Sequence, residues 1–392
     1  MNVCFIVPAA YSLFYGNVFE FPFGGSELRA YTLANKLAEN KKIKVSFTLF
    51  NHGQMREENF KEIKVYAFPY KTGNFYDRET LLSRFIGKIK QRFNKEHQTT
   101  SYGKLFPEFF KKINADIYIY FGVSDISFFY LNVLKDLNKK NILFLSSDDD
   151  LSDKYQIGSN EKNSYGSRNN TCRKLLDESV HVVSQTELQQ QKLLKQFNKR
   201  SVVIRNPIEL KLEIKDANTS LEKPYALWIG KSDAIKRPEI LIELAKRNKE
   251  KKFLMIMNKS NQKKHEKIIC DLPLNVNYLQ SVSLNEIEIY FRNAAFLINT
   301  SVFEGVPNTF LQAGKYSIPV LSINVDPDGM LIKHKGGILT GENIDLLSEK
   351  CNELFSDEEK RRTMGGNLRN YIENNHDVDT VVKNLTQYLM SV

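Results

Sequence analysis

Short apolar runs alternate with helical patterns along the first half of the chain. These runs are rich in β-branched and aromatic residues, and we expect strands at 3–8, 43–50, 63–69, 116–122, 141–146 and 180–184. Their almost continuous apolar character is typical of strands that are covered on both faces of a sheet. Alanine and leucine at helical spacing predict a helix over 26–40, and another is expected over 185–197.

The same alternation begins again after a join at 202–212 and the polar, turn-rich segment 216–224. Further strands are expected at 225–230, 252–257, 275–280, 296–301, 319–324 and 337–340, with helices such as 237–248 between them. The restart predicts two successive doubly wound α/β domains, at 1–206 and 207–376. A C-terminal helix over 377–392 follows, and its packing against the N-terminal domain is left open.

The composition agrees with a globular chain of two domains. The chain has 392 residues, of which 42% are hydrophobic and 26% charged, so it can form a sizeable core. Its four cysteines form no CxxC pattern, and we expect reduced thiols in a cytoplasmic protein. No apolar run approaches the roughly 20 residues of a membrane span, and residues 1–10 read as a first strand.

The formal net charge of +10 favours an anionic partner, which leaves nucleic acid, anionic lipid and phosphorylated small molecules as candidates. Much of the lysine is scattered, as on an ordinary solvated surface. No helix-turn-helix pattern and no strand that combines aromatic with basic residues is evident. We therefore do not predict nucleic-acid binding.

Ligands of open parallel sheets lie at the carboxyl ends of the strands, so the residues that follow each strand are the candidate site. After the first strand, Gly24 and Gly25 open a helix and would let a phosphate approach the backbone. After the first strand of the second domain, Gly230 is followed by three cations that could hold a diphosphate, Lys231, Lys236 and Arg237. The alternatives are a glycine turn capped by Ser26 and a solvated basic loop.

A third polar group follows the strand at 296–301. Glu304 comes first, and Pro307 suits the first turn of a helix. The sequence predicts amides near an anion at Gly305, Val306, Asn308 and Thr309. Gln312 lies further along this helix, and both polar side chains could bond sugar hydroxyls. The alternative for Glu304 is an acidic cap that complements the helix dipole.

Taken together, these motifs resemble the retaining glycosyltransferases of family 4, and the resemblance covers nearly the whole chain. The matching stretches are GGSE, GKSDAIKRPEILIELA, SVFEGVPNTFLQAGKYSIPVL, NVDPDGML, and VVSQTELQQQKLLKQF followed by VIRNPI. The resemblance implies the GT-B fold, in which two Rossmann-like domains face each other across a cleft. It assigns acceptor binding to the first domain and nucleotide-sugar binding to the second.

The resemblance also implies roles for single residues. Glu304, Lys231 and Lys236 match the positions expected to act in catalysis. The positions expected to bind the donor are Gly24, Gly25, Gly230, Gly305, Val306, Asn308, Thr309 and Gln312. Gln312 departs from the family pattern, which has glutamate there, so we expect weaker or altered binding of the ribose.

A second departure concerns the acceptor side. The family often has a histidine at a strand end of the first domain, and the counterpart here, 146–150, contains none. Asp148 and Asp149 are therefore expected to contact the sugar or the acceptor. The acidic run 148–150 could alternatively hold a divalent metal, but the resemblance implies no metal and no cofactor. The donor is expected to be a nucleoside-diphosphate sugar, with UDP favoured over GDP.

The expected activity is transfer of a hexose-type sugar, with retention, to a cell-surface glycan or a lipid-linked acceptor. Residues 81–95 predict an amphipathic helix with a basic rim, which would suit an anionic membrane at the inner face of the cell envelope. The alternative is an ordinary helix on the domain core. Two other functions stay open: a sugar-nucleotide epimerase, and a non-catalytic protein that binds a sugar nucleotide.

Overall fold

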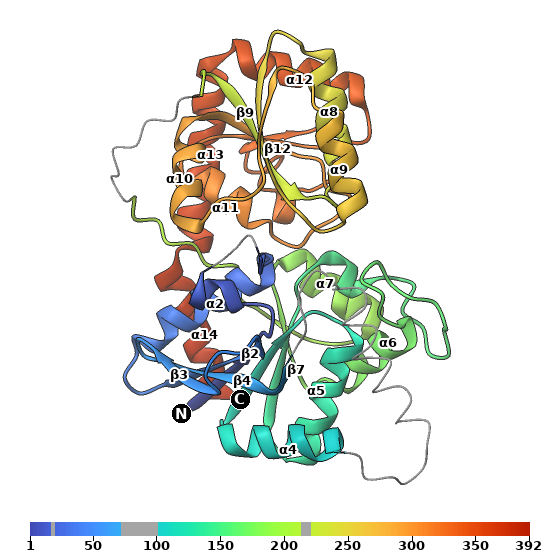
Figure 1. Ribbon diagram of the computed structural model, residues 1–392, viewed down its shortest axis with the longest axis vertical. Coiled ribbons are helices and arrows are strands. Elements are labelled where there is room, and N and C mark those ends of the chain that lie inside the picture. The colour runs from blue at the N-terminus through green and yellow to red at the C-terminus, as the bar shows by residue number, and fades with distance from the viewer. Residues whose placement is uncertain (17–19, 72–100, 213–220) are drawn as a thin grey trace. The chain divides into compact units, whose positions relative to one another are not determined.

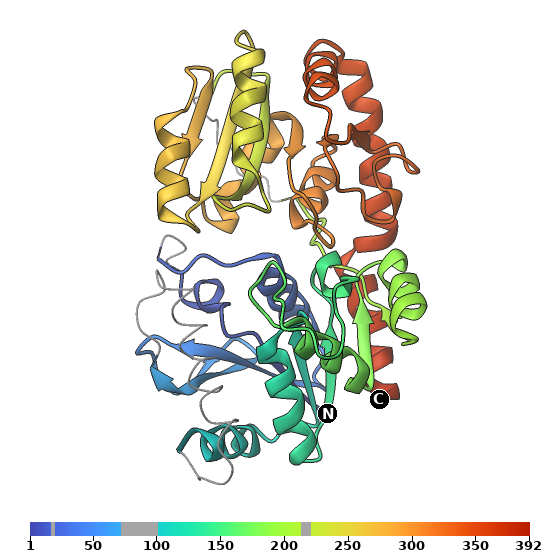
Figure 2. The same cartoon turned by 90° about the vertical axis from the view of Figure 1, so that its right-hand side faces the viewer.

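The computed structural model describes residues 1–16, 20–71, 101–212 and 221–392. The chain forms two compact units, one of Met1–Pro207 with Val381–Val392 and one of Ile208–Thr380. Both ends of the chain therefore lie in the first unit (Figure 2). The sequence placed these limits at 206 and 376. The amphipathic helix that we expected at 81–95 lies outside the described residues.

The first unit is built on one twisted sheet with the strand order β3-β4-β2-β1-β5-β6-β7-β8. All pairings are parallel except that of β3 with β4. The elements are β1 (Asn2–Ile6), α1 (Tyr11–Tyr15), α2 (Gly25–Ala38), β2 (Lys44–Asn51), β3 (Glu57–Phe60), β4 (Ile63–Lys71), α4 (Ser101–Ile113), β5 (Ile117–Phe121), α5 (Asp125–Asp136), β6 (Lys140–Phe144), α6 (Asn169–Glu178), β7 (His181–Ser184), α7 (Glu187–Phe197) and β8 (Val202–Val203).

Helices cover both faces of this sheet (Figure 1). On one face, alternate strand residues such as Cys4 and Tyr118 pack in a single core with α4, α5, α6 and α7. On the other face lies α2, whose alanines and leucines recur at helical spacing and are buried. Burial on both faces explains why the strands read as almost continuous apolar runs.

The second unit repeats this plan with the strand order β11-β10-β9-β12-β13-β14, all parallel. Its elements are β9 (Tyr225–Lys231), α8 (Pro238–Arg247), β10 (Lys252–Asn258), α9 (Gln262–Cys270), β11 (Val276–Leu279), α10 (Leu284–Asn293), β12 (Ala294–Asn299), α11 (Asn308–Lys315), β13 (Val320–Ser322), β14 (Gly337–Leu339), α12 (Ile344–Ser356) and α13 (Glu358–His376). The last helix, α14 (Val378–Ser391), contributes its residues from Val381 onward to the first unit.

Side chains of β9 alternate between the two faces of the second sheet. Tyr225 and Leu227 pack with α10, α11 and α13, whereas Ala226 and Trp228 pack with α8, α9 and α12. In both sheets the chain order reverses beside the first strand, between β1 and β5 and between β9 and β12. Such a reversal is where doubly wound sheets bind ligands.

The predicted fold class, α/β with two Rossmann-like doubly wound domains, is confirmed. Two strands were not predicted: β3, a short antiparallel edge strand, and β8, which has only two residues. The strand expected at 319–324 is shorter, at Val320–Ser322. In the described parts of the chain, no helix combines the length and apolar character needed to cross a bilayer.

Candidate functional site

The second unit brings two of the predicted residues into contact. Lys236 follows β9 and Glu304 follows β12, the two strands that flank the reversal of chain order. The Lys236 ammonium donates to Glu304 Oε1 at 2.5 Å. Their side chains are 25% and 14% exposed, so both are largely removed from water without being fully buried. The charge pair therefore sits where this type of sheet binds ligands.

Glu304 has two further donors from the end of its own strand. The Asn299 amide and the Ser301 hydroxyl reach Oε1 at 3.1 and 2.7 Å, and none of the three donors reaches Oε2. Burial alone raises the pKa of the Glu304 carboxyl. The Lys236 charge and the three hydrogen bonds outweigh burial, so that the pKa lies below its usual range. Glu304 is therefore a fixed carboxylate at neutral pH.

The loop between β9 and α8 holds Lys236 through its backbone. Asp233 Oδ1 accepts from the amides of Ile235 and Lys236 at 3.0 and 2.8 Å. The Thr300 hydroxyl donates to the Lys236 carbonyl at 2.6 Å and accepts from the Trp228 indole at 2.9 Å. The loops that follow β9 and β12 are thus tied together directly beside the charge pair.

Gly230 and Lys231, both predicted to bind the donor diphosphate, form the end of β9. A Cβ at Gly230 would come within 2.6 Å of the Trp228 ring, which gives a packing reason for glycine at this position. Lys231 is half-buried and pairs in register with Asn258 of β10. Both residues therefore lie at the same edge of the sheet as Lys236.

The segment that follows Glu304 leads into α11. The helix begins at Asn308, and Pro307 is its N-cap residue with φ −63° and ψ 125°, not a first-turn residue as expected. Gly305 and Val306 are buried, while Thr309 and Gln312 are half-buried. Gln312 is the fifth residue of the helix. Because the first amides of a helix have no helical partner, this end of α11 can accept an anion.

In the first unit, Gly24 and Gly25 lie at the start of α2. Gly24 is the N-cap residue, and its amide donates to the Glu27 carboxylate at 2.9 Å. The suggestion that Ser26 caps this helix is therefore wrong, because the helix begins at Gly25 and Ser26 lies inside its first turn. The Gly24 amide is used within the protein by this capping interaction.

The acidic run 148–150 forms a 3-10 turn after β6, and each carboxylate has a partner from the protein. Asp148 accepts from the Gln189 amide at 2.9 Å, and Asp149 from the Ser164 hydroxyl at 3.0 Å. Asp150 is buried and accepts three backbone amides, those of Val123, Ser146 and Ser147.

Burial raises the pKa of Asp150 to about 6, although its three amide donors act in the opposite direction. Within the described ranges, no three His, Cys, Asp or Glu side chains are grouped so that they could hold a metal ion. Asp150 therefore joins the loops that follow β5 and β6. Asp148 and Asp149 lie beside it, at the carboxyl ends of these strands.

The sequence analysis did not single out His52, which directly follows β2 and so lies at the carboxyl edge of the first sheet. Its ring contacts Tyr11, Phe21 and Phe50, with centroids 4.8, 4.4 and 6.3 Å away. Burial lowers the pKa of this imidazole, which favours the neutral form. The available signal was its place two residues after the strand predicted at 43–50.

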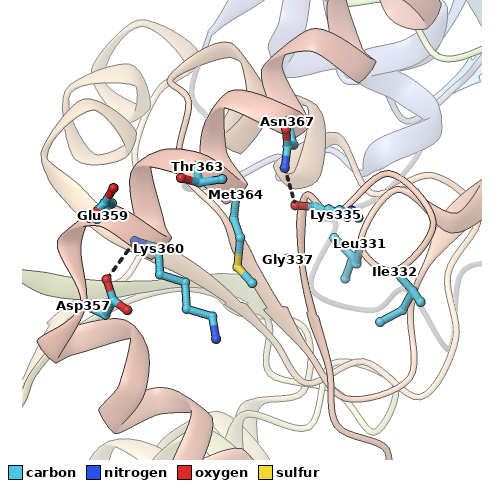
Figure 3. A pocket seen from close by; sticks show the side chains of 10 residues that line it. All are labelled: Leu331, Ile332, Lys335, Gly337, Asp357, Glu359, Lys360, Thr363, Met364 and Asn367. Carbon is cyan, nitrogen blue, oxygen red and sulfur yellow. Dashed lines mark hydrogen bonds between the residues drawn. The ribbon is translucent and has the colours of Figure 1, made fainter.

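A hollow of about 490 Å³ lies elsewhere in the second unit, between the first half of α13 and the segment that leads into β14 (Figure 3). Leu331 and Met364 contribute apolar surface, and the Asn367 amide donates to the Lys335 carbonyl at 3.2 Å. The hollow lies at the amino end of β14 and includes none of the predicted site residues. It is therefore separate from Lys236 and Glu304, which lie at the carboxyl ends of the strands.

Comparisons with known proteins bear on the family and the fold. Residues 211–371 match the family model of the glycosyl transferases group 1, and this segment contains Lys231, Lys236, Glu304 and Gln312. No curated protein matches the sequence.

Solved structures match over almost the whole chain. Sucrose-phosphate synthase from Thermosynechococcus elongatus is 15% identical with a TM-score of 0.78, covering 100% of this chain and 98% of its own. TarM from S. aureus, solved with UDP and alpha-GlcNAc-glycerol, is 13% identical with a TM-score of 0.68, covering 98% and 99%. WaaG, a glycosyltransferase of lipopolysaccharide biosynthesis, is 14% identical with a TM-score of 0.64, covering 98% of each chain. The fold is that of GT-B glycosyltransferases, and the family match supports a glycosyltransferase.

Proposed function

We propose that this chain is a retaining glycosyltransferase of the family 4 type, which moves a sugar from a nucleoside-diphosphate sugar to an acceptor hydroxyl without a bound metal. The observation that carries the proposal is the contact between Lys236 and Glu304 beside the chain reversal of the second sheet. This pair lies inside the segment that matches the group 1 family model. A cation and a fixed carboxylate suit the two ends of a sugar diphosphate.

In this proposal, Lys231 and Lys236 neutralise the departing diphosphate together with the N-terminal end of α11, where Gly305, Val306, Asn308 and Thr309 lie. Glu304 Oε2 accepts a hydroxyl of the donor sugar, and Gln312 binds the ribose. The bond between the anomeric carbon and the diphosphate oxygen breaks while a bond to the acceptor oxygen forms on the same face. The acceptor proton passes to the leaving phosphate, so no pair of catalytic carboxylates is needed.

We propose a UDP-sugar as donor, because the similar TarM structure contains UDP. We propose a cell-surface glycan or lipid-linked acceptor, and action at the cytoplasmic face of the membrane, because WaaG acts in lipopolysaccharide biosynthesis. We propose that Gly24 and Gly25, at the start of α2, bind the donor, and that Asp148 and Asp149, which follow β6, contact the sugar or the acceptor.

A second candidate is a non-catalytic protein that binds a sugar nucleotide. It is favoured by Gln312, which stands where the family pattern has glutamate, and by the serine and aspartate residues at 146–150. Like the glycosyltransferase, this candidate should bind the nucleotide, but it should transfer no sugar.

The experiment is calorimetric titration of the chain with UDP, GDP and their common sugars, followed by product analysis with mixed glycan and lipid-linked acceptors. We expect selective binding of one nucleotide, extra affinity from one sugar, and a product with the anomeric configuration of the donor. Binding without turnover would favour the non-catalytic candidate. Conversion of the sugar nucleotide to its epimer in the absence of an acceptor would identify an epimerase. A folded chain that binds no nucleotide would contradict all three.

Gln312→Glu is expected to tighten binding of the preferred nucleoside diphosphate by roughly 3–10-fold, because a carboxylate accepts from the ribose diol more strongly than an amide does. Calorimetry with the ribonucleotide and its 2′-deoxy analogue measures the effect. The gain should be absent for the deoxy analogue, which lacks one hydroxyl of the diol. An equal gain for both nucleotides would show that residue 312 does not contact the ribose.

A further inference from the structure

Arg237, the residue next to Lys236, adopts a backbone conformation that is unusual for its type. Its φ of 48° and ψ of 58° lie in the left-handed region, where glycine is favoured and a side chain is strained. It is also the N-cap residue of α8, although its side chain forms no capping bond. Contacts of the guanidinium must therefore offset the strain.

The guanidinium makes those contacts with two other loops. Its Nε donates to the Thr300 carbonyl at 2.8 Å, and Nη2 approaches the Ser301 carbonyl at 3.4 Å. Its Nη1 donates to both oxygens of Glu342, at 2.8 and 2.9 Å. The side chain of Arg237 is only 16% exposed, whereas that of Glu342 is 60% exposed. The Asn324 amide donates to the same Glu342 carboxylate.

These residues come from the carboxyl ends of four adjacent strands. Arg237 follows β9, Thr300 and Ser301 follow β12, Asn324 follows β13 and Glu342 follows β14, and the sheet order is β9-β12-β13-β14. An isolated surface ion pair contributes little to stability. This pair differs because one guanidinium and one carboxylate connect four successive loops.

The connection bears directly on the contact between Lys236 and Glu304. Thr300, whose carbonyl is bound by Arg237, donates its hydroxyl to the Lys236 carbonyl. Ser301, whose carbonyl is also approached by Arg237, donates its hydroxyl to Glu304 Oε1. Arg237 therefore contacts two of the residues that orient the charge pair. Because its own donors are used in this way, Arg237 acts on Lys236 through the backbone.

We propose that Arg237 and Glu342 form a clamp that positions Lys236 and Glu304 before the nucleotide binds. Holding a site in its binding conformation lowers the cost of ordering it when the ligand arrives. The clamp is a positioning device, and its effect on affinity rests on the proposed function. Its effect on the loops themselves does not depend on that function.

The test uses variants of the full chain. Glu342→Gln keeps the size of the side chain and removes its charge, whereas Arg237→Lys keeps the charge and removes the planar fork. Arg237→Gly removes the side chain and relieves the backbone strain. Asp345→Asn is the matched control, because it breaks an exposed ion pair with Arg247 that joins α8 and α12 in the same unit.

Two measurements are made on each variant. Hydrogen exchange of the ligand-free chain reports peptides that cover 232–237, 300–304 and 322–326. Calorimetry reports the affinity for UDP and GDP. We expect Glu342→Gln and both Arg237 variants to exchange faster in all three peptides and to bind the preferred nucleotide roughly 5–20-fold more weakly. Asp345→Asn should match the parent in both measurements.

Faster exchange that is confined to one loop, or that equals the change in the control, would overturn the clamp. Loops that loosen together while nucleotide affinity stays at the parent value would overturn its role in positioning the charge pair. If the loops loosen together but the parent chain binds neither UDP nor GDP, the clamp is supported and the proposed function fails. The two conclusions are therefore tested separately.

Discussion

Lys236→Ala is expected to weaken binding of the preferred nucleoside diphosphate by roughly 30–100-fold, because the variant loses a charged donor to the diphosphate. The loss has a second component. In the parent, the ammonium is bonded to Glu304 Oε1 at 2.5 Å. Without it, the carboxylate keeps its Asn299 and Ser301 donors but has no cation beside it, and it lies close to an incoming dianion. Calorimetry with the nucleoside diphosphate measures both components together.

The double variant Lys236→Ala/Glu304→Gln separates the two components, because it removes the repelling carboxylate as well. It should bind the diphosphate more tightly than Lys236→Ala alone, so the two effects are not additive. Lys264→Ala is the control. Lys264 donates to the Asp233 carbonyl of the same loop and pairs with Glu239, so its loss removes a nearby charge and leaves Glu304 paired. Equal weakening in the control would mean that only the overall charge matters.

The same variant makes a prediction for stability as a function of pH. The pKa of Glu304 lies below its usual value in the folded parent, so its contribution to stability is present above the unfolded pKa and is lost as pH falls through the folded pKa. In Lys236→Ala, burial remains and the main opposing charge is gone, so the pKa of Glu304 rises. The variant should therefore have a lower free energy of unfolding than the parent, and the difference should be largest at neutral pH, at roughly 2 kcal/mol.

Unfolding of parent and variant between about pH 4 and 8 measures this difference. The difference between the two free energies of unfolding should shrink as pH falls, since a protonated Glu304 carries no charge for the Lys236 ammonium to neutralise. A gap that is constant with pH would show that the ammonium does not stabilise the carboxylate.

Most of the fold could be predicted because both sheets are buried on two faces. That burial gives runs such as 225–230 and 252–257 a strong apolar signal, and the strands lie at Tyr225–Lys231 and Lys252–Asn258. The signal fails where burial is slight. The edge strand Glu57–Phe60 is polar and mostly half-buried, so no period or propensity marks it.

The candidate site could be predicted only in part, for a related reason. Position after a strand places Lys236 and Glu304 at one edge of a sheet, but their contact depends on β9 and β12 being neighbours across 68 residues of sequence. The sequence grouped Arg237 with Lys231 and Lys236 as a cation for the diphosphate, and its contacts with Thr300 and Glu342 were not predicted. Neither its positive φ nor its reach to Glu342 has a local sequence signal.

Glu304→Gln is expected to lower kcat of transfer by roughly 100–1000-fold while changing nucleoside-diphosphate affinity by less than about threefold. Glutamine keeps the size of the side chain and one oxygen for Lys236 and Ser301, so the loop should retain its shape. It removes the negative charge, which in the proposed site faces the sugar as positive charge develops on the anomeric carbon. The parent and the variant are compared by initial rates and by calorimetry with the nucleotide and the nucleotide sugar.

The added affinity that the sugar gives the parent should disappear in Glu304→Gln, because an amide accepts a sugar hydroxyl less strongly than a carboxylate does. Glu288→Gln is the matched control, since Glu288 Oε1 also accepts from a lysine, the buried Lys315, at 2.5 Å, and this ion pair joins α10 to α11. That variant should transfer sugar at close to the parent rate. If Glu304→Gln also kept the parent rate and the sugar increment, the carboxylate would be a structural partner of Lys236 alone, and the donor sugar would have to be held by other residues.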